Sequence, residues 1–232
     1  MAETAPTAFT EYMKGSVPRR RTLEILEIGG GAKTHVPMAN ARYTVVDVCE
    51  DALERNRYAS DVIVGDAQSM DYGARKFDIL VFWNTLEHMA DPGAALLQAL
   101  PALRPNGLVV VRGPELRSLK GLVTRLTPHW FHVQFYRRVL GRPDAGQPGS
   151  APYAVEHAED ASPERIVDLL GDHRCRIEFE EHYVGDQLTS LRAYSGIAYG
   201  AYQVASGVLR GLTRARWGLS ATDFVFAFRK LA

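Results

Sequence analysis

The stretch Leu23–Asp47, which opens with LEILEIGGGAKT and closes with YTVVD, decides the fold of this chain. An apolar strand reaches an acid at Glu27 and three glycines at Gly29–Gly31, and a second apolar strand ends at Asp47. Because glycine has no Cβ, its backbone can turn sharply and approach a ligand closely. A carboxylate after the second strand suits ribose hydroxyls, since it accepts two hydrogen bonds at once. The stretch therefore predicts a site for a nucleoside cofactor.

Apolar runs continue along the chain and alternate with segments that favour helix. Asp91-Pro92 supplies an N-cap and a first-turn proline for a helix that ends near Arg104, and Ser162-Pro163 does the same for a helix to about Leu170. Residues 50–58 are also expected to be helical. This alternation predicts a mostly parallel sheet with helices on both faces. The expected strands are 23–28, 43–48, 62–65, 77–83, 108–112, 174–184 and 222–229.

Composition narrows the class of protein. The 232 residues include 27 basic and 27 acidic side chains, and this balance argues against nucleic acid as a partner. Two cysteines without metal-ligand spacing suit a reducing compartment, so a cytoplasmic location is expected. The first twenty residues do not resemble a secretory signal, and the longest run without charge, 193–209, is shorter than the ~20 residues that span a bilayer.

Four motifs in register over 22–113 resemble the nucleotide-binding half of a class I S-adenosylmethionine-dependent methyltransferase, of the small-molecule group. They are Glu27-Ile28-Gly29-Gly30-Gly31, Asp47, Gly65-Asp66-Ala67, and Phe77-Asp78-Ile79 with the following segment from Asn84 to Pro92. The resemblance implies S-adenosylmethionine as the cofactor. It assigns the methionine end to the glycine turn, the ribose to Asp47, and the adenine to the Asp66 carboxylate and the Ala67 amide. The implied cofactor residues are Glu27, Gly29, Gly30, Gly31, Asp47, Val48, Asp66, Ala67 and Asn84.

The chain departs from the family pattern at the start of the first helix. Lys33 stands where a third glycine is usual, and Pro37 lies inside a short interval, so an abbreviated helix is expected. A nicotinamide-dependent dehydrogenase is disfavoured because its fingerprint needs glycine where Thr34 stands. Some relatives bind a metal through a Glu-His pair and an acid three residues earlier. Here that position is Asn84, so no metal site is expected at Glu87-His88.

The resemblance implies a Rossmann-like α/β fold of seven mostly parallel strands flanked by helices, with an antiparallel last strand and a helical insertion after the fifth strand. We expect one domain over 1–232, in which 22–113 bind the cofactor and 114–161 cover the acceptor. Residues 162–232 would complete the sheet and add a glycine-rich apolar helix.

Several histidines could remove a proton from an acceptor hydroxyl. We predict His88 and His132 as general bases, and His129 and His157 are further candidates. The segment from Pro128 to Arg138 combines aromatic, imidazole and guanidinium groups that suit an anionic ring, but its helical spacing equally fits an apolar packing stripe.

A glycine-rich apolar segment lies at 188–212. Small residues four apart let helices approach closely. The segment is consistent with a helix packed on its own domain, with a homodimer surface, or with peripheral membrane contact through residues 188–216, where arginines would face lipid phosphates.

The sequence therefore predicts an enzyme, an S-adenosylmethionine-dependent methyltransferase acting on a small molecule. The expected acceptor is a hydroxyl of a sugar, a glycan precursor or a natural product. The alternative is a non-catalytic module that keeps the fold and docks on a membrane or a protein partner.

Overall fold

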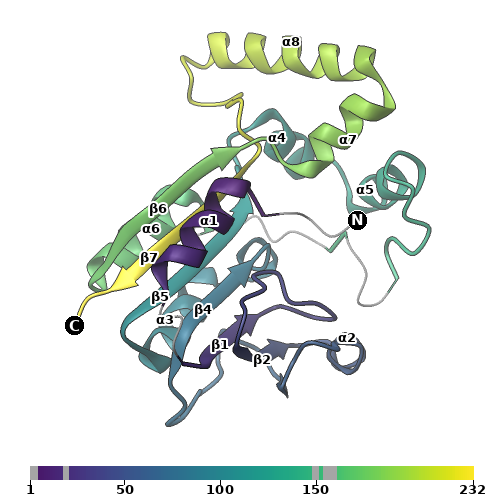
Figure 1. The fold of residues 1–232 in the computed structure, drawn as a ribbon. Helices are drawn as coiled ribbons and strands as arrows, with labels where there is room; N and C mark the ends of the chain where they lie inside the picture. The colour runs from purple at the N-terminus through teal and green to yellow at the C-terminus, as the bar shows by residue number, and fades with distance from the viewer. Residues whose placement is uncertain (1–4, 18–20, 148–151, 154–160) are drawn as a thin grey trace. The chain divides into compact units, whose positions relative to one another are not determined.

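A seven-stranded sheet in the order β3-β2-β1-β4-β5-β7-β6 organises the computed structural model, which describes residues 5–17, 21–147, 152–153 and 161–232. Neighbouring strands from β3 to β5 pair in parallel, and β7 runs opposite to the others (Figure 1). This confirms the predicted sheet, including its antiparallel last strand. The strands are β1 Leu23–Ile28, β2 Ala41–Asp47, β3 Asp61–Val64, β4 Phe77–Trp83, β5 Leu103–Pro114, β6 Cys175–Tyr183 and β7 Asp223–Lys230.

The chain separates into two compact units. The larger comprises Ala5–Gly113, Glu156–Glu181 and Val225–Ala232, and the smaller comprises Met1–Thr4, Pro114–Val155 and His182–Phe224. The larger unit contains the helices α1 Thr7–Ser16, α2 Glu50–Glu54, α3 Pro92–Ala99 and α6 Pro163–Asp172, with the 3₁₀ turns η1 Leu86–His88 and η2 Leu100–Ala102. The smaller contains α4 Leu119–Leu126, α5 His129–Arg138, α7 Asp186–Tyr194 and α8 Gly196–Leu212.

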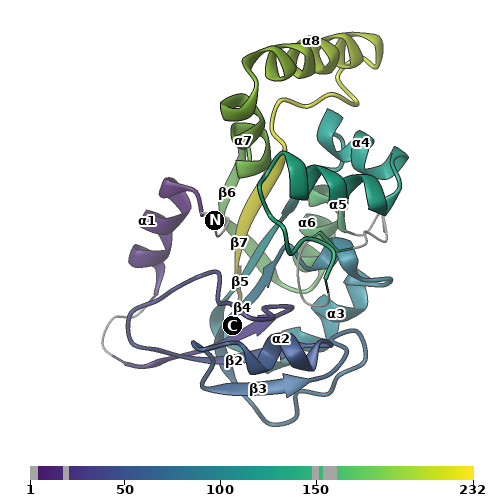
Figure 2. The same cartoon turned by 90° about the vertical axis from the view of Figure 1, so that its right-hand side faces the viewer.

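Helices cover both faces of the sheet in the larger unit. Figures 1 and 2 show α1 on one face and α3 and α6 on the other. Every residue of β4 is buried, as expected for a central strand that is covered twice. Phe9 of α1 contributes to this burial, because its ring lies 5.8 Å from Trp83 and 5.7 Å from Phe179 between centroids.

The predicted helix starts are confirmed. The Asp91 carboxylate accepts a hydrogen bond from the Ala94 amide at 2.8 Å, and Pro92 occupies the first turn. The Ser162 hydroxyl likewise accepts from the Arg165 amide at the start of α6.

Three predicted boundaries are wrong. Residues 29–40 form no helix at all, although an abbreviated one was expected after the glycines. The helix predicted over 50–58 ends at Glu54, because the Asn56 side chain binds the Gly31 carbonyl and accepts hydrogen bonds from two following amides. The helix expected to end near Arg104 stops at Ala99. Strand β5 already starts at Leu103, and its pairing with β4 shifts in register between Phe77 and Ile79.

Arg229 on β7 links several segments of the larger unit. Its guanidinium donates to Glu178 on β6 at 2.8 and 3.0 Å, and to the carbonyls of Ser16 and Asn106 at 3.0 and 2.9 Å. The hydrogen bonds from Arg229 are the main reason that the pKa of Glu178 lies below its usual value near 4.5. The pair therefore contributes stability above this pH, and the contribution is lost as the pH falls through the lower folded value.

We expect Arg229→Met to lower the free energy of unfolding by about 2 kcal/mol at neutral pH, because charge-assisted hydrogen bonds are lost from a largely buried group. Urea denaturation between pH 7 and pH 3 would measure the cost, which should shrink once Glu178 is protonated. Arg176→Met is the matched control: Arg176 also binds Glu178, at 3.1 Å, but is exposed, so less than about 1 kcal/mol is expected. An equal cost for both variants at every pH would contradict the assigned role of Arg229.

The smaller unit corrects the prediction for residues 188–212. This segment is not one helix, because Ser195 has an extended backbone with φ −154° and separates α7 from α8. Its hydroxyl caps α8 by accepting from the Ala198 amide at 3.2 Å. Within α8, the half-buried Tyr202 accepts a hydrogen bond from the Lys120 amide at its hydroxyl at 3.3 Å, whereas Val208 is exposed.

Candidate functional site

The carboxyl ends of β1, β2, β3 and β4 meet at one edge of the sheet in the larger unit. Parallel registers place Ile28 beside Val46 and Phe82, and Asp47 beside Val64. The loops that follow these strands carry all the predicted cofactor residues apart from Glu27 and Asp47, which belong to the ends of β1 and β2. Ligands of open parallel sheets bind at such an edge.

The glycine turn after β1 contains two residues in the left-handed region, where glycine is favoured. Gly29 has φ +70°, and a Cβ there would lie 2.3 Å from Cγ2 of Thr85. Gly31 has φ +52°, and a Cβ there would come within 3.5 Å of Oδ2 of Asp47. The turn therefore brings its backbone against the loop after β4 and against the acid that ends β2.

Glu27 is fully buried beneath this turn. Its Oε1 accepts from the His35 amide at 3.0 Å and lies 2.6 Å from His35 Nδ1. Its Oε2 is buried and has no hydrogen-bond partner among the residues that the structure describes. A buried carboxylate oxygen without a partner is costly, so a donor such as an ammonium group suits this position.

Asp47 and Asp66 lie close together through the β2–β3 pairing, and the Gly65 amide donates to the Asp47 carbonyl at 3.0 Å. Asp47 Oδ1 accepts from the Cys49 amide at 2.9 Å, which orients the carboxylate at the strand end. The neighbouring Val48 is 71% exposed and leaves an apolar surface open at the predicted cofactor edge.

Gln68 holds the Asp66 loop in place. Its amide and side-chain nitrogen both donate to Asp66 Oδ1 at 2.9 Å, and its Oε1 accepts from the Asp91 amide at 2.7 Å. Ala67 is buried between them. The predicted adenine pair is therefore tied to the segment after β4.

The segment after β4 begins with a left-handed residue. Asn84 has φ +51°, which asparagine tolerates better than most residues, and its amide donates to the Arg112 carbonyl at 2.9 Å. The Thr85 hydroxyl donates towards the carbonyls of Ile28 and Trp83 at 3.0 and 3.2 Å, which fastens this loop to the glycine turn. His88 follows in η1 at the same edge, with Nε2 4.0 Å from Glu87 Oε1.

Three residues that shape the site were not predicted: His35, Thr85 and Gln68. His35 stacks on Trp83 with ring centroids 6.2 Å apart while it binds Glu27. A histidine eight residues after the acid gives no periodic signal, because residues 29–40 form no regular element. Gln68 could have been suspected from its place directly after Asp66-Ala67.

His132 lies in the smaller unit on α5, with Nε2 3.0 Å from the Thr127 hydroxyl oxygen. On α5 and its C-cap, Phe135 and Val139 are half-buried, whereas Trp130 and Phe131 are exposed, so both interpretations of this helix stay predictions. His129 belongs to the same helix, and His157 lies outside the described residues. The roles of His88 and His132 as bases remain predictions.

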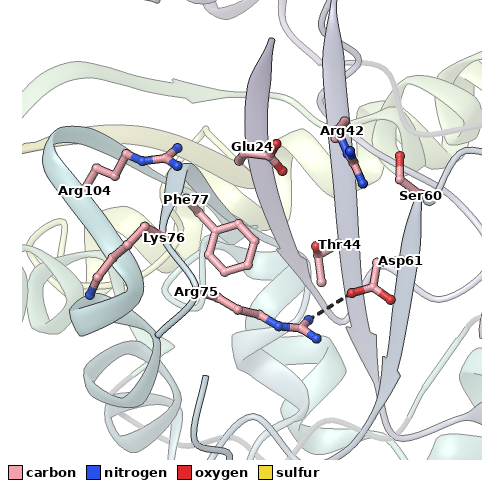
Figure 3. Close-up of a pocket in the computed structure, with 9 residues that line it drawn as sticks. All are labelled: Glu24, Arg42, Thr44, Ser60, Asp61, Arg75, Lys76, Phe77 and Arg104. Atoms are coloured by element: carbon pink, nitrogen blue, oxygen red, sulfur yellow. Dashed lines mark hydrogen bonds and ion pairs between the residues drawn. The ribbon is translucent and has the colours of Figure 1, made fainter. Parts of the chain in front are cut away.

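A hollow of about 500 Å³ lies at the opposite edge of the sheet, where the strands begin (Figure 3). Its lining comes from the first residues of β1 to β5 and the preceding loops. Most of its cations are bound within the protein: Arg75 pairs with Asp61 at 3.0 Å, Lys76 donates to the Pro101 carbonyl at 2.7 Å, and Arg104 is 2.9 Å from Asp78. These contacts hold the strand starts together. Because the hollow lies at the opposite edge of the sheet, it is distinct from the predicted cofactor edge.

Residues 4–143, more than half of the chain, match the family described as a methyltransferase domain. The chain belongs to this family. Membership confirms the resemblance to class I S-adenosylmethionine-dependent methyltransferases, and S-adenosylmethionine is the cofactor that it implies.

Known members of the family and of its fold show where the similarity lies. A ubiquinone biosynthesis O-methyltransferase from Caulobacter sp. strain K31 is 33% identical over 113 residues, which are 43% of this chain and 44% of the relative. A 27-O-demethylrifamycin SV methyltransferase from Amycolatopsis mediterranei is 31% identical over 118 residues, 45% and 43% of the two chains. The chain thus spans less than half the length of these curated relatives. The YcgJ protein from Bacillus subtilis shares the fold, with a TM-score of 0.58 at 12% identity over 98% of this chain and 100% of that chain.

The residues of this methyltransferase-family protein fit S-adenosylmethionine. The cofactor carries an ammonium group, which suits the buried Oε2 of Glu27, and ribose hydroxyls, which suit the carboxylate of Asp47. Within the described ranges, no three His, Cys, Asp or Glu side chains gather in a group that could hold a metal ion.

Proposed function

We propose that this protein is an S-adenosylmethionine-dependent methyltransferase that acts on a hydroxyl of a small molecule, a sugar, a glycan precursor or a natural product. The observation that carries the proposal is the buried Oε2 of Glu27, which has no hydrogen-bond partner in the described part of the chain and lies at the same sheet edge as Asp47 and Asp66. Family membership supports the chemistry. The names of two relatives, both of which specify O-methylation, support a hydroxyl acceptor.

Each cofactor residue has a proposed role. Glu27 would bind the ammonium group, Asp47 the ribose hydroxyls, and Asp66 with the Ala67 amide the adenine. When bound, S-adenosylmethionine supplies a methyl group on a positively charged sulfur, so the displacement needs no covalent help from the protein. The protein contributes alignment, which accounts for about 7 to 11 kcal/mol of the barrier in well-oriented reactions. Residues 114–161 are proposed to cover the acceptor.

His88 is the proposed general base at the carboxyl edge, and His132 is the second candidate. The His88 side chain is 25% exposed, so an acceptor hydroxyl can reach it, and its amide is fixed to the Thr85 carbonyl at 3.1 Å. Proton removal by such a group contributes about 10²- to 10⁴-fold to the rate.

Replacing His88 by Ala is therefore expected to lower kcat about 10²-fold or more while the affinity for S-adenosylhomocysteine stays within a few-fold. Steady-state rates and calorimetric titration with S-adenosylhomocysteine would check this. His173→Ala is the control, because His173 is exposed and binds the Leu169 carbonyl at the end of α6. Full activity of a His88→Ala, His132→Ala double variant would remove both histidines as bases.

Methyl transfer itself is tested with labelled S-adenosylmethionine and a panel of phenols, sugars and amines. Label in hydroxyl acceptors supports the proposal, and label confined to amines overturns the acceptor class. Tight binding of S-adenosylmethionine without transfer to any acceptor would favour the non-catalytic module.

A further inference from the structure

Helix α8 of the smaller unit exposes a continuous apolar face. Side chains that recur with helical spacing point away from the unit, and their exposed fractions are large: 88% for Ile197, 68% for Val204, 56% for Val208 and 81% for Leu212. The opposite face is the packed one, because the Ser206 hydroxyl donates to the Gly218 carbonyl at 3.0 Å. A contiguous exposed apolar face on a folded protein usually marks an interaction site.

The glycines of α8 support this interpretation. A Cβ built on any of its four glycines would meet nothing within 4 Å, so no described part of the chain packs on them. Glycine also weakens a helix relative to alanine, so a contact that covers the helix would offset this cost. The four positions are Gly196, Gly200, Gly207 and Gly211.

The charges around the apolar face are all positive. Residues 187–222 contain four arginines and no acid. Arg210 lies in the last turn of α8 and Arg214 and Arg216 follow the helix, and none of the three forms an ion pair within the described part of the chain. At the other end, Tyr194 is 66% exposed. Apolar side chains bordered by arginine and an aromatic ring are typical of a helix that lies in a membrane interface.

A second copy of this chain suits the face less well. A symmetric dimer pairs the same patch with itself, and residues 187–222 contain no carboxylate that could neutralise the arginines of the other copy. An anionic bilayer satisfies both features, because it accepts the apolar side chains and neutralises the arginines. No helix in the described ranges is long and apolar enough to cross a membrane, so the contact would be peripheral.

We propose that α8 docks this protein on an anionic lipid bilayer. The helix lies in the plane of the interface, with Ile197, Val204, Val208 and Leu212 towards the acyl chains and Arg210, Arg214 and Arg216 at the lipid phosphates. This assignment is independent of methyl transfer, because it concerns a different unit and a different readout.

Flotation of the full chain with vesicles tests the proposal. The protein should float with vesicles of equal parts phosphatidylglycerol and phosphatidylcholine, and much less with phosphatidylcholine alone. The double substitution Val204→Asp and Val208→Asp should lower the partition coefficient at least about tenfold, since both charges would enter the face that contacts the acyl chains. Replacing Arg210, Arg214 and Arg216 by Gln should lower it about fivefold per arginine, on anionic vesicles only.

Leu231→Asp is the control, because Leu231 is 43% exposed in the larger unit and places a carboxylate outside α8. It should float like the wild type, and circular dichroism would establish that each variant is folded. Failure of the wild type to float, or equal flotation of the Val204→Asp, Val208→Asp variant, overturns the proposal. The membrane proposal would also be overturned if the wild type does not float but sediments as a dimer, and this variant sediments as a monomer. That result would assign the face to a second copy of the chain.

Discussion

Gly29→Ala is expected to abolish detectable binding of S-adenosylhomocysteine and to lower the free energy of unfolding by about 3 kcal/mol. An alanine at φ +70° costs roughly 1 to 2 kcal/mol in backbone strain. Its Cβ would also lie 2.3 Å from Thr85 Cγ2 and 2.5 Å from Thr85 Oγ1. Thr85 cannot yield easily, because its hydroxyl binds the carbonyls of Ile28 and Trp83, so overpacking adds about 1 to 3 kcal/mol. Urea denaturation and calorimetric titration measure the two effects.

Gly73→Ala separates strain from steric overlap. Gly73 has φ +59°, close to that of Gly29, but a Cβ there meets nothing within 4 Å. We expect this control to lose only about 1 to 2 kcal/mol and to bind S-adenosylhomocysteine normally. Equal destabilisation by the two substitutions, with binding intact in both, would show that the turn is not held against Thr85 as described.

Asp47→Ala is expected to weaken S-adenosylhomocysteine binding at least about tenfold, or about 1.4 kcal/mol. The carboxylate that ends β2 would accept two ribose hydrogen bonds, and alanine leaves both hydroxyls without this partner. Asp47→Asn preserves an oxygen for the Cys49 amide, which Asp47 Oδ1 binds at 2.9 Å, but loses the charge and one acceptor. A loss of affinity in both variants indicates a direct role of the carboxylate, and calorimetry provides the dissociation constants.

Asp61→Ala is the control for Asp47. Asp61 starts the adjacent strand at the opposite edge, where it is exposed and paired with Arg75, so its replacement should leave affinity unchanged. If Asp47→Ala binds as tightly as this control, the ribose has been assigned to the wrong residue.

The strands and the helix caps could be predicted because each depends on local sequence. The β1 and β4 boundaries at Leu23–Ile28 and Phe77–Trp83 are correct, since these mostly apolar runs lie in buried central strands. The Asp91-Pro92 start of α3 is correct because the cap and the proline act within one turn.

Two of the errors arise where a side chain competes with the helix for backbone groups. Asn56 ends α2 early by binding the Gly31 carbonyl, which is 25 residues away in sequence. Ser195 divides the apolar segment because its hydroxyl caps a new helix. Hydrophobic periodicity gives no information on either contact, so it predicted longer helices than the chain forms.

The candidate cofactor residues could be predicted from sequence motifs, but the residues that hold them in place could not. The resemblance assigns Glu27, Asp47 and Asp66 to the cofactor, and the structure brings the elements that carry them to one edge. His35, which binds Glu27, and Gln68, which fixes Asp66, act through contacts across loops without any regular repeat. Such residues can be recognised only from the three-dimensional arrangement of the loops.

A crystal structure of the protein with S-adenosylhomocysteine is the most direct test of binding at this edge. We predict the amino group of the ligand at Glu27 Oε2, its ribose at Asp47 and its adenine beside Asp66, with the hollow at the strand starts free of ligand. Ligand density at the opposite edge, lined by Arg42 and Arg75, or no density under saturating ligand, would contradict this assignment.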